Sequence, residues 1–156
     1  MNATEDLDNI FSLLHDGWIS VMQGDFEKLT VEVQCEYLAE LIDASFNRFY
    51  LQLIGIDKFE FHPWWKEDAV ENKAITDITE IASLELGICS AEIREDFVNV
   101  YCDTDNSNAY TGGNLFLRCR KIILFDQNRN EMTVDSLTEI CKGYWDNFGK
   151  KRSIEG

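Results

Sequence analysis

The chain holds two histidines, and each could act as an acid or a base only beside a suitable partner. His15 directly precedes Asp16 in a stretch that predicts a turn, where a histidine is usually a surface residue or a helix cap. His62 alternates with Phe59 and Phe61, so in a strand it points away from the two rings, toward water or a cleft. A cleft at His62 with nearby acids would indicate a small-molecule-binding protein or a hydrolase.

The sequence contains none of the compact motifs that mark common enzyme classes, so an enzyme is the less favoured prediction. The segment Asp103-x-Asp105-x-Ser107 begins like a calcium loop, with oxygen ligands on alternate positions. A calcium loop needs glycine at its sixth position and a bidentate glutamate at its twelfth, but the chain has Asn108 and Asn114 there. We therefore expect an Asx-rich hairpin loop, no metal and no cofactor.

Two adjacent tryptophans are the strongest candidates for a binding surface. Trp64 and Trp65 follow Pro63 and precede a charged run, so at least one indole is expected at the sheet edge, where a partner can cover it. Tyr110 lies in a polar loop and is a second exposed candidate. The competing interpretation is an indole that folds back over the core. The predicted partner-binding residues are Trp64, Trp65, Glu60, Glu67, Asp68, Glu71 and Tyr110, with Asp43 as a further acid.

The charge balance narrows the class of partner. Fourteen Lys and Arg against 29 Asp and Glu give 156 residues a net charge of −15, and the acids lie mostly in residues 1–104. This excess repels phosphate backbones and anionic lipid headgroups, so neither nucleic acid nor a membrane surface is expected as a partner. A basic protein partner fits better, although an acidic surface that only maintains solubility explains the same numbers.

Cysteine usage and the first residues predict a cytoplasmic protein. The chain begins with acids where a secretory signal would carry Lys or Arg, and its apolar stretches are too short for a membrane span. The cysteines are odd in number and form no C-x-x-C pair, so we expect reduced and mostly buried thiols. They are Cys35, Cys89, Cys102, Cys119 and Cys141.

The spacing of apolar residues predicts one mainly β domain. Leu7, Ile10, Phe11 and Leu14 mark one face of a short N-terminal helix, with Thr4 as a cap. Alternation predicts strands over 18–22, 29–35, 49–53, 59–62, 84–88, 98–102 and 115–125. Pro63 is expected to close its strand, turns are expected over 90–94, 103–113 and 126–131, and 75–81 fits either helix or strand.

The last predicted element is a C-terminal helix. Its apolar stripe runs from Val134 to Phe148, with Thr133 or Ser136 as start signals and Gly149 as a stop. We therefore expect a domain over 1–149 and a basic tail over 150–156. The predicted fold class is α+β, mainly β: an antiparallel sheet or sandwich with a short N-terminal helix and a packed C-terminal helix.

The order of these features resembles small uncharacterised bacterial proteins of the immunity type. The resemblance rests on His15-Asp16-Gly17 before a hairpin, on the alternating strands, and on Tyr144-Trp145 late in the C-terminal helix. Such proteins are cytoplasmic, often acidic, and block a cognate toxin by binding it. The resemblance transfers no functional residue.

Two hypotheses follow from the sequence. The first is a non-catalytic protein that binds a basic protein, such as a toxin domain, through acids around Trp64 and Trp65. The alternative is a small-molecule binder or hydrolase with a cleft near His62. A homo-oligomer with an aromatic seam stays open as a third arrangement.

Overall fold

The structure is a computed structural model that describes residues 2–65 and 73–155, with side chains as far as residue 146. This part of the chain forms four helices and one antiparallel sheet of seven strands. It confirms the predicted fold class, including the short N-terminal helix and the C-terminal helix. In chain order the elements are α1 (Ala3–Leu13), β1 (Trp18–Gly24), β2 (Lys28–Gln34), α2 (Glu36–Ala39), β3 (Arg48–Trp65), α3 (Ile78–Ser83), β4 (Gly87–Arg94), β5 (Phe97–Asp103), β6 (Tyr110–Phe125), β7 (Glu131–Met132) and α4 (Val134–Glu155).

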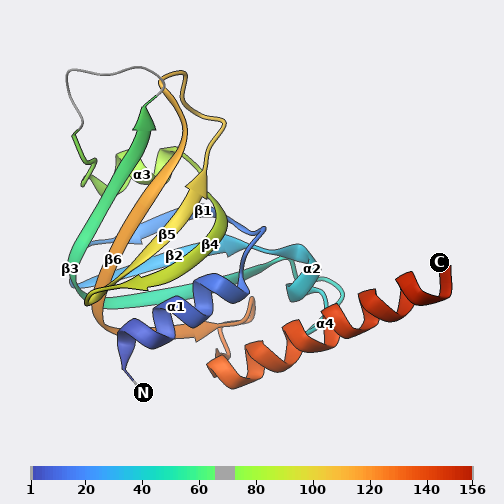
Figure 1. Ribbon diagram of the computed structural model, residues 1–156. Helices are drawn as coiled ribbons and strands as arrows, with labels where there is room; N and C mark the ends of the chain where they lie inside the picture. The colour runs from blue at the N-terminus through green and yellow to red at the C-terminus, as the bar shows by residue number, and fades with distance from the viewer. Residues whose placement is uncertain (1, 66–72, 156) are drawn as a thin grey trace.

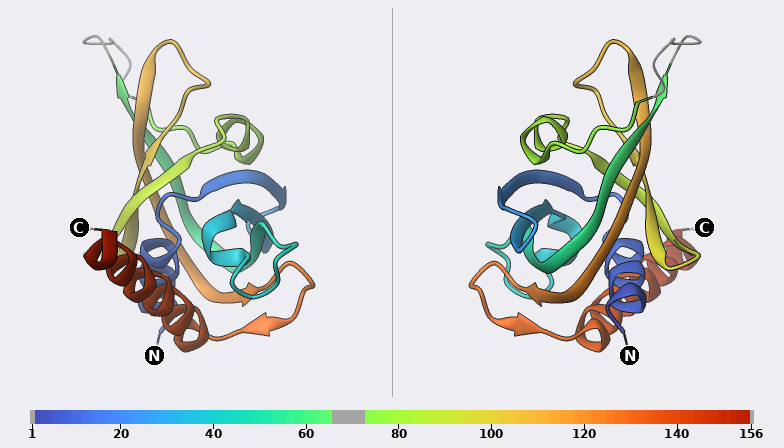
Figure 2. Two further views of the ribbon diagram at one scale, coloured as in Figure 1. Left: turned by 90° about the vertical axis from the view of Figure 1, so that its right-hand side faces the viewer. Right: turned by 90° about the vertical axis from the view of Figure 1, so that its left-hand side faces the viewer.

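The sheet closes on itself through its two longest strands. The strand order is β3-β2-β1-β4-β5-β6-β7, and β3 also pairs with β6. Figure 1 shows β3, β6 and β5 side by side, and the two views of Figure 2 place β1 on the opposite side of the molecule. Within the described residues, β1 and β4 pair only through Trp18 and Gly87. We call this junction the seam.

The N-terminal helix covers the sheet next to the seam. The four residues of its predicted apolar face are all buried: Leu7, Ile10, Phe11 and Leu14. The cap is Asn2 rather than Thr4, because the Asn2 side chain accepts the Glu5 N–H at 2.8 Å. Helix α1 packs against β4, β5 and β6, so its apolar face completes the core that the strands enclose.

Strand β3 corrects two predictions. The two short strands expected over 49–53 and 59–62 are one element. Gly55 (φ +64°) and a register shift between Ile56 and Lys58 interrupt its regularity without ending it. Pro63 does not close the strand, which runs on to Trp65. Beyond residue 54 β3 has lost its β2 neighbour, so Pro63 needs to donate no ladder hydrogen bond on that edge.

The region before β5 also differs from its prediction. Alternating Leu84, Leu86 and Ile88 predicted a strand, but the chain there ends α3 and turns at Glu85, which has φ +48°. Strand β4 begins only at Gly87 and includes the segment 90–94 that was expected to turn; the turn follows at Glu95 (φ +51°). All three apolar residues are buried, but only Ile88 lies in a strand, so the alternation of Leu84 and Leu86 arises from the end of α3 and the turn.

Helix α4 begins as predicted and ends later. Thr133 Oγ1 accepts the Ser136 N–H at 3.0 Å, which confirms the start signal. Gly149 does not stop the helix, which continues to Glu155, so the predicted basic tail over 150–156 is helical as far as residue 155. Glycine lowers helix propensity by about 1 kcal/mol relative to alanine, and the helix interior tolerates it. No helix in the described part of the chain combines the length and apolar character needed to cross a membrane.

The five cysteines are free, as predicted, and four of them are buried. The exception is Cys89 on β4. Burial raises the pKa of Cys35 to about 12 and that of Cys119 to about 11, because the interior disfavours a thiolate.

Candidate functional site

The three predicted aromatic residues divide between surface and core. Trp64 is exposed (44%) at the end of β3. Trp65 is half-buried, with its ring edge-on to Tyr110 at 5.1 Å between centroids. The expectation that Tyr110 is exposed is wrong, because it begins β6 and its ring packs against Phe61 and Trp65. One indole is therefore available to a partner, while the other covers the core with Tyr110.

His62 and Glu60 lie together on the outer face of β3. His62 Nε2 lies 3.0 Å from Glu60 Oε1, and Lys58 Nζ lies 3.5 Å from Glu60 Oε2. Burial opposes the charge on Glu60, but the hydrogen bond with His62 and the charge of Lys58 outweigh it and lower the carboxyl pKa. The His62 ring packs on Phe116 at 4.4 Å. These contacts hold the imidazole against a sheet face, and the hydrolase alternative stays a prediction.

The remaining predicted acids do not gather around Trp64 within the described residues. Glu67, Asp68 and Glu71 lie outside that part of the chain. Asp43 follows α2 and closes its own turn, since its Oδ1 accepts the N–H and the hydroxyl of Ser45 at 2.9 and 2.7 Å. These hydrogen bonds lower the pKa of the Asp43 carboxyl.

A different tryptophan lies among acids, at the seam. After α1 the chain turns at Asp16 (φ +71°) and passes Gly17, where a Cβ would lie 2.9 Å from the carbonyl oxygens of Leu14 and Gln34. Strand β1 begins at once, and its alternation buries the residue after Trp18 and turns the indole outward. Trp18 is 41% exposed, about as much as Trp64.

Two pockets flank Trp18 and share its side chain as a wall. The first, of about 660 Å³, lies toward β2 and α2, and the second, of about 300 Å³, lies toward β4 and β5. Six carboxylate residues line them, and among the described residues neither lining includes Lys or Arg. We call this set the Trp18 surface: Trp18 with Asp16, Glu36 and Glu40 on one side and Glu85, Asp103 and Asp105 on the other.

Hydrogen bonds fix the segments that carry these acids. On the first side, the Tyr37 hydroxyl donates to the His15 carbonyl at 2.8 Å and ties α2 to the turn before β1. On the second side, the Thr104 hydroxyl donates to the Leu84 carbonyl at 2.6 Å, and the Asn106 side chain donates to Ser83 at 3.2 Å. The acids therefore lie on an ordered framework, so ligand binding should cost little conformational entropy in these segments.

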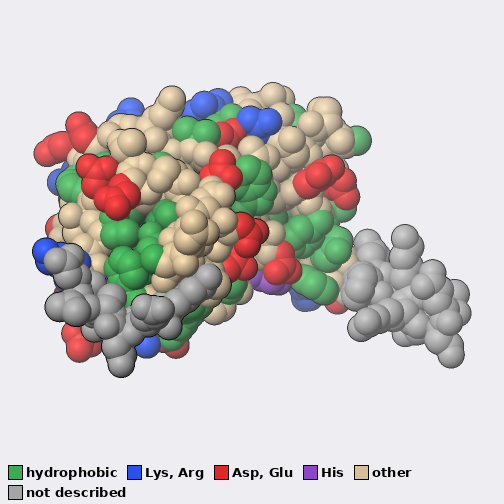
Figure 3. Space-filling view, turned by 90° about the horizontal axis from the view of Figure 1, so that it is seen from above, with side chains coloured by type: hydrophobic (Ala, Val, Ile, Leu, Met, Phe, Trp, Pro, Cys, Tyr) green, Lys and Arg blue, Asp and Glu red, His purple; other side chains and the backbone are tan. Residues whose placement is uncertain are grey.

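Several of the acids remain available to a ligand. No described side chain makes a hydrogen bond or ion pair with the carboxylates of Glu36, Glu40 or Asp105. Burial, followed by the negative charge of Asp103, raises the pKa of the Cys89 thiol on β4. Figure 3 shows acidic side chains recurring between hydrophobic ones on the upper face of the molecule. The negative potential of these carboxylates attracts cations and repels anions.

Sequence reasoning missed this surface because its members come from four separate segments. The turn before β1, α2, the end of α3 and the loop after β5 meet only when the sheet closes at the seam. One local signal was present, since Trp18 directly follows Gly17 at the start of a strand. The calcium-like pair Asp103 and Asp105 does line one pocket, but no three described His, Cys, Asp or Glu side chains are placed to share a metal ion.

A scan of the chain against protein-family models finds no match, and searches of curated proteins and of solved structures find none either. The class of protein is therefore described from its fold and its site alone. It is a mainly β α+β domain with an exposed indole between two acid-lined pockets.

Proposed function

We propose that this protein is a non-catalytic binding protein that holds a basic protein partner against the Trp18 surface. One observation carries the proposal: an exposed indole separates two pockets that together present six carboxylates and, in the described residues, no basic side chain. Tryptophan is enriched among residues that dominate binding energy. Its ring face also attracts Arg and Lys side chains, which the neighbouring carboxylates can hold as ion pairs.

The charge of the whole chain supports a basic partner. At −15 the protein accelerates encounter with a basic surface and repels another acidic one. Self-association through the Trp18 surface would bring like charges together, so we place a different molecule there rather than a second copy. A toxin domain with a basic surface is a partner of this chemistry. Neutralising such a domain in the cytoplasm is the specific role we propose, in line with the resemblance to immunity-type proteins.

The two equally exposed tryptophans allow a matched test. We would compare wild type, Trp18→Ser and Trp64→Ser as immobilised baits for cytoplasmic lysate of the source organism, at low and high salt, and measure the affinity of each captured basic protein. Loss of a central tryptophan typically costs 2 kcal/mol or more, so Trp18→Ser should weaken binding by about 30-fold or more. Trp64→Ser should bind like wild type.

Salt provides the second criterion. Raising the salt to about 1 M shortens the screening length to about 3 Å, which should release a partner held by ion pairs. If Trp64→Ser loses the partner and Trp18→Ser keeps it, the interface is the one that the sequence predicted, and the proposal is wrong. Binding that persists at high salt and survives both substitutions contradicts an acidic interface altogether.

A further inference from the structure

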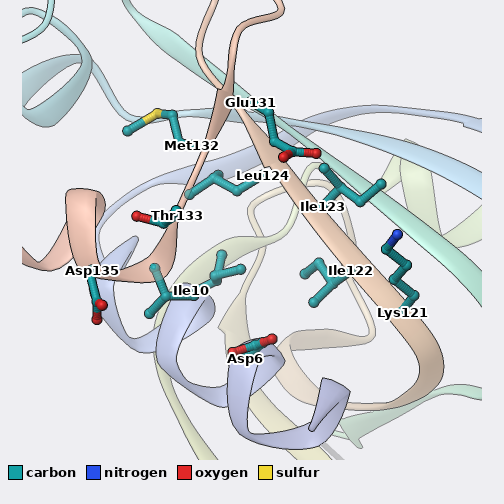
Figure 4. A pocket seen from close by; sticks show the side chains of 11 residues that line it. Asp6, Ile10, Lys121, Ile122, Ile123, Leu124, Glu131, Met132, Thr133 and Asp135 are labelled. Atoms are coloured by element: carbon teal, nitrogen blue, oxygen red, sulfur yellow. The ribbon is translucent and has the colours of Figure 1, made fainter. Parts of the chain in front are cut away.

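A separate pocket of about 340 Å³ opens where α1, β6, β7 and the start of α4 meet. Figure 4 shows its lining: Asp6 and Ile10 come from α1, residues 121–124 from β6, and residues 131–135 from β7 and the start of α4. It shares no lining residue with the two pockets beside Trp18. Its chemistry is therefore independent of the function proposed above.

The floor of this pocket is apolar. Ile10 and Leu124 are almost completely buried, and the partly buried side chains of Ile122, Met132 and Val134 continue the same surface. A floor of this kind favours a hydrocarbon chain and disfavours a small, strongly hydrated ion. The volume is in the range of pockets that hold small organic ligands.

The rim is charged and unbalanced. Figure 4 shows Asp6, Glu131, Asp135 and Lys121 arranged around the apolar side chains of Ile10 and Ile122. Three carboxylates face one ammonium, which leaves an excess of two negative charges. Within the described residues, none of the four charged side chains makes a hydrogen bond or ion pair, so their charges are available to a ligand.

We propose that this pocket binds an organic amine: a protonated amino group on an apolar chain of several carbons. The ammonium would lie at the rim between Asp6 and Asp135, and the chain would cover the partly exposed side chains of Ile122, Met132 and Val134. The carboxylate excess selects the cation over neutral and anionic molecules of the same shape. The apolar floor separates an alkylamine from a metal ion or free ammonium, since each buried methylene strengthens binding about fourfold.

Three probes of equal length separate the two contributions. Titrations of the full chain with hexylamine, hexanol and hexanoate, followed by the methyl resonances of Ile10, Ile122 and Leu124, report where and how tightly each one binds. Hexylamine should bind at least fivefold more tightly than hexanol, and hexanoate should bind most weakly. Butylamine should bind about 16-fold more weakly than hexylamine if both terminal methylenes lie on the floor.

Variants test the charge assignment. Asp6→Asn with Asp135→Asn should weaken hexylamine at least fivefold and leave hexanol unchanged. Lys121→Gln should tighten hexylamine about twofold, a gain that misfolding cannot produce. Glu139→Gln, which removes an exposed carboxylate of α4 that lines neither this pocket nor the Trp18 surface, is the matched control and should change neither.

Four results would overturn the proposal. Equal binding of hexylamine and hexanol would show an apolar groove without cation selection, and tighter binding of hexanoate would show that Lys121 dominates. Methyl shifts confined to residues outside the pocket would place the amine elsewhere. A double variant that binds hexylamine like wild type would exclude the two carboxylates. Each of these outcomes leaves the proposal for the Trp18 surface unaffected, because the two sites share no residue.

Discussion

Replacing Asn99 with leucine should stabilise the protein, although it removes a polar residue from a strand. Asn99 is completely buried in β5, between Glu92 on β4 and Phe116 on β6. Neither its side-chain oxygen nor its nitrogen has a hydrogen-bond partner within the described residues. A buried amide without partners is one of the costlier arrangements in a protein interior.

The size of the effect follows from what the amide gains and loses. Removing an unpaired buried amide should return about 1–3 kcal/mol. Leucine keeps the branching of the asparagine side chain and is somewhat larger, so the gain is expected toward the lower end of this range. The Asn99 amide faces Glu92 and makes the smallest of the contributions that lower the pKa of that carboxyl, but the contact does not have the geometry of a hydrogen bond. Glu92 already accepts hydrogen bonds from Tyr101 at 2.6 Å and Arg94 at 3.2 Å. For a chain of this length, 1–3 kcal/mol corresponds to a rise in Tm of about 2–12 °C.

Chemical denaturation of wild type and Asn99→Leu, with thermal melts of both, would measure the change. Asn106→Leu is the matched control: its side chain donates to Ser83 and to Glu85, so the same replacement should destabilise by about 1 kcal/mol. If Asn99→Leu lowers the free energy of unfolding, the Asn99 amide has a partner, such as a buried water, and the reasoning fails.

Two further predictions concern the start of α4 and the thiols. Thr133→Ala should lower the free energy of unfolding by about 1 kcal/mol, because it removes the acceptor for the Ser136 N–H. Thr138→Ala, within the same helix, should be nearly neutral or stabilising. Equal losses of stability for the two variants in denaturant titrations would contradict the cap. In the folded protein one of the five thiols, Cys89, should react with a thiol reagent within minutes and the other four only after unfolding. Its rate should be below that of free cysteine because burial and Asp103 raise its pKa, Cys89→Ser should abolish the fast phase, and a second fast thiol would contradict the burial described above.

Local patterns predicted most of the fold. The apolar faces of α1, β2 and β5 could be predicted because the apolar residues of each element lie on one face, and the period of the pattern then identifies the element. The pattern did not predict that Glu32 and Asn99, on the opposite faces of β2 and β5, are also buried. The errors fall where burial and period separate. Residues 84–86 continue the alternating pattern outside a strand, and β3 keeps its partner β6 through a bulge and a proline that would end most strands.

The candidate sites were much less predictable, because they depend on how the sheet closes. Adjacent tryptophans drew attention to Trp64 and Trp65, and the structure exposes only the first of them. The acids around Trp18 are spread from residue 16 to residue 105. The pocket for which we propose an organic amine joins α1 to β6, more than 100 residues later in the chain. No spacing rule connects positions so far apart. The charge excess, which indicated a cationic ligand, was the one property that needed no coordinates.

The position of the Trp18 surface over the seam links partner binding to the stability of the sheet. The ladder between β1 and β4 is a single residue pair, Trp18 with Gly87. Three backbone hydrogen bonds flank it: the N–H groups of Asp16, Ile19 and Ile88 donate to the carbonyls of Ile88, Leu86 and Gly17 at 2.8, 2.7 and 2.8 Å. Local unfolding begins where few backbone hydrogen bonds must break. The seam is therefore where we expect the closed sheet to open first. The two acid-lined pockets lie on opposite sides of it. A partner that fills both pockets would bridge the seam. Its binding should therefore slow amide exchange at the seam and raise the free energy of unfolding of the closed sheet.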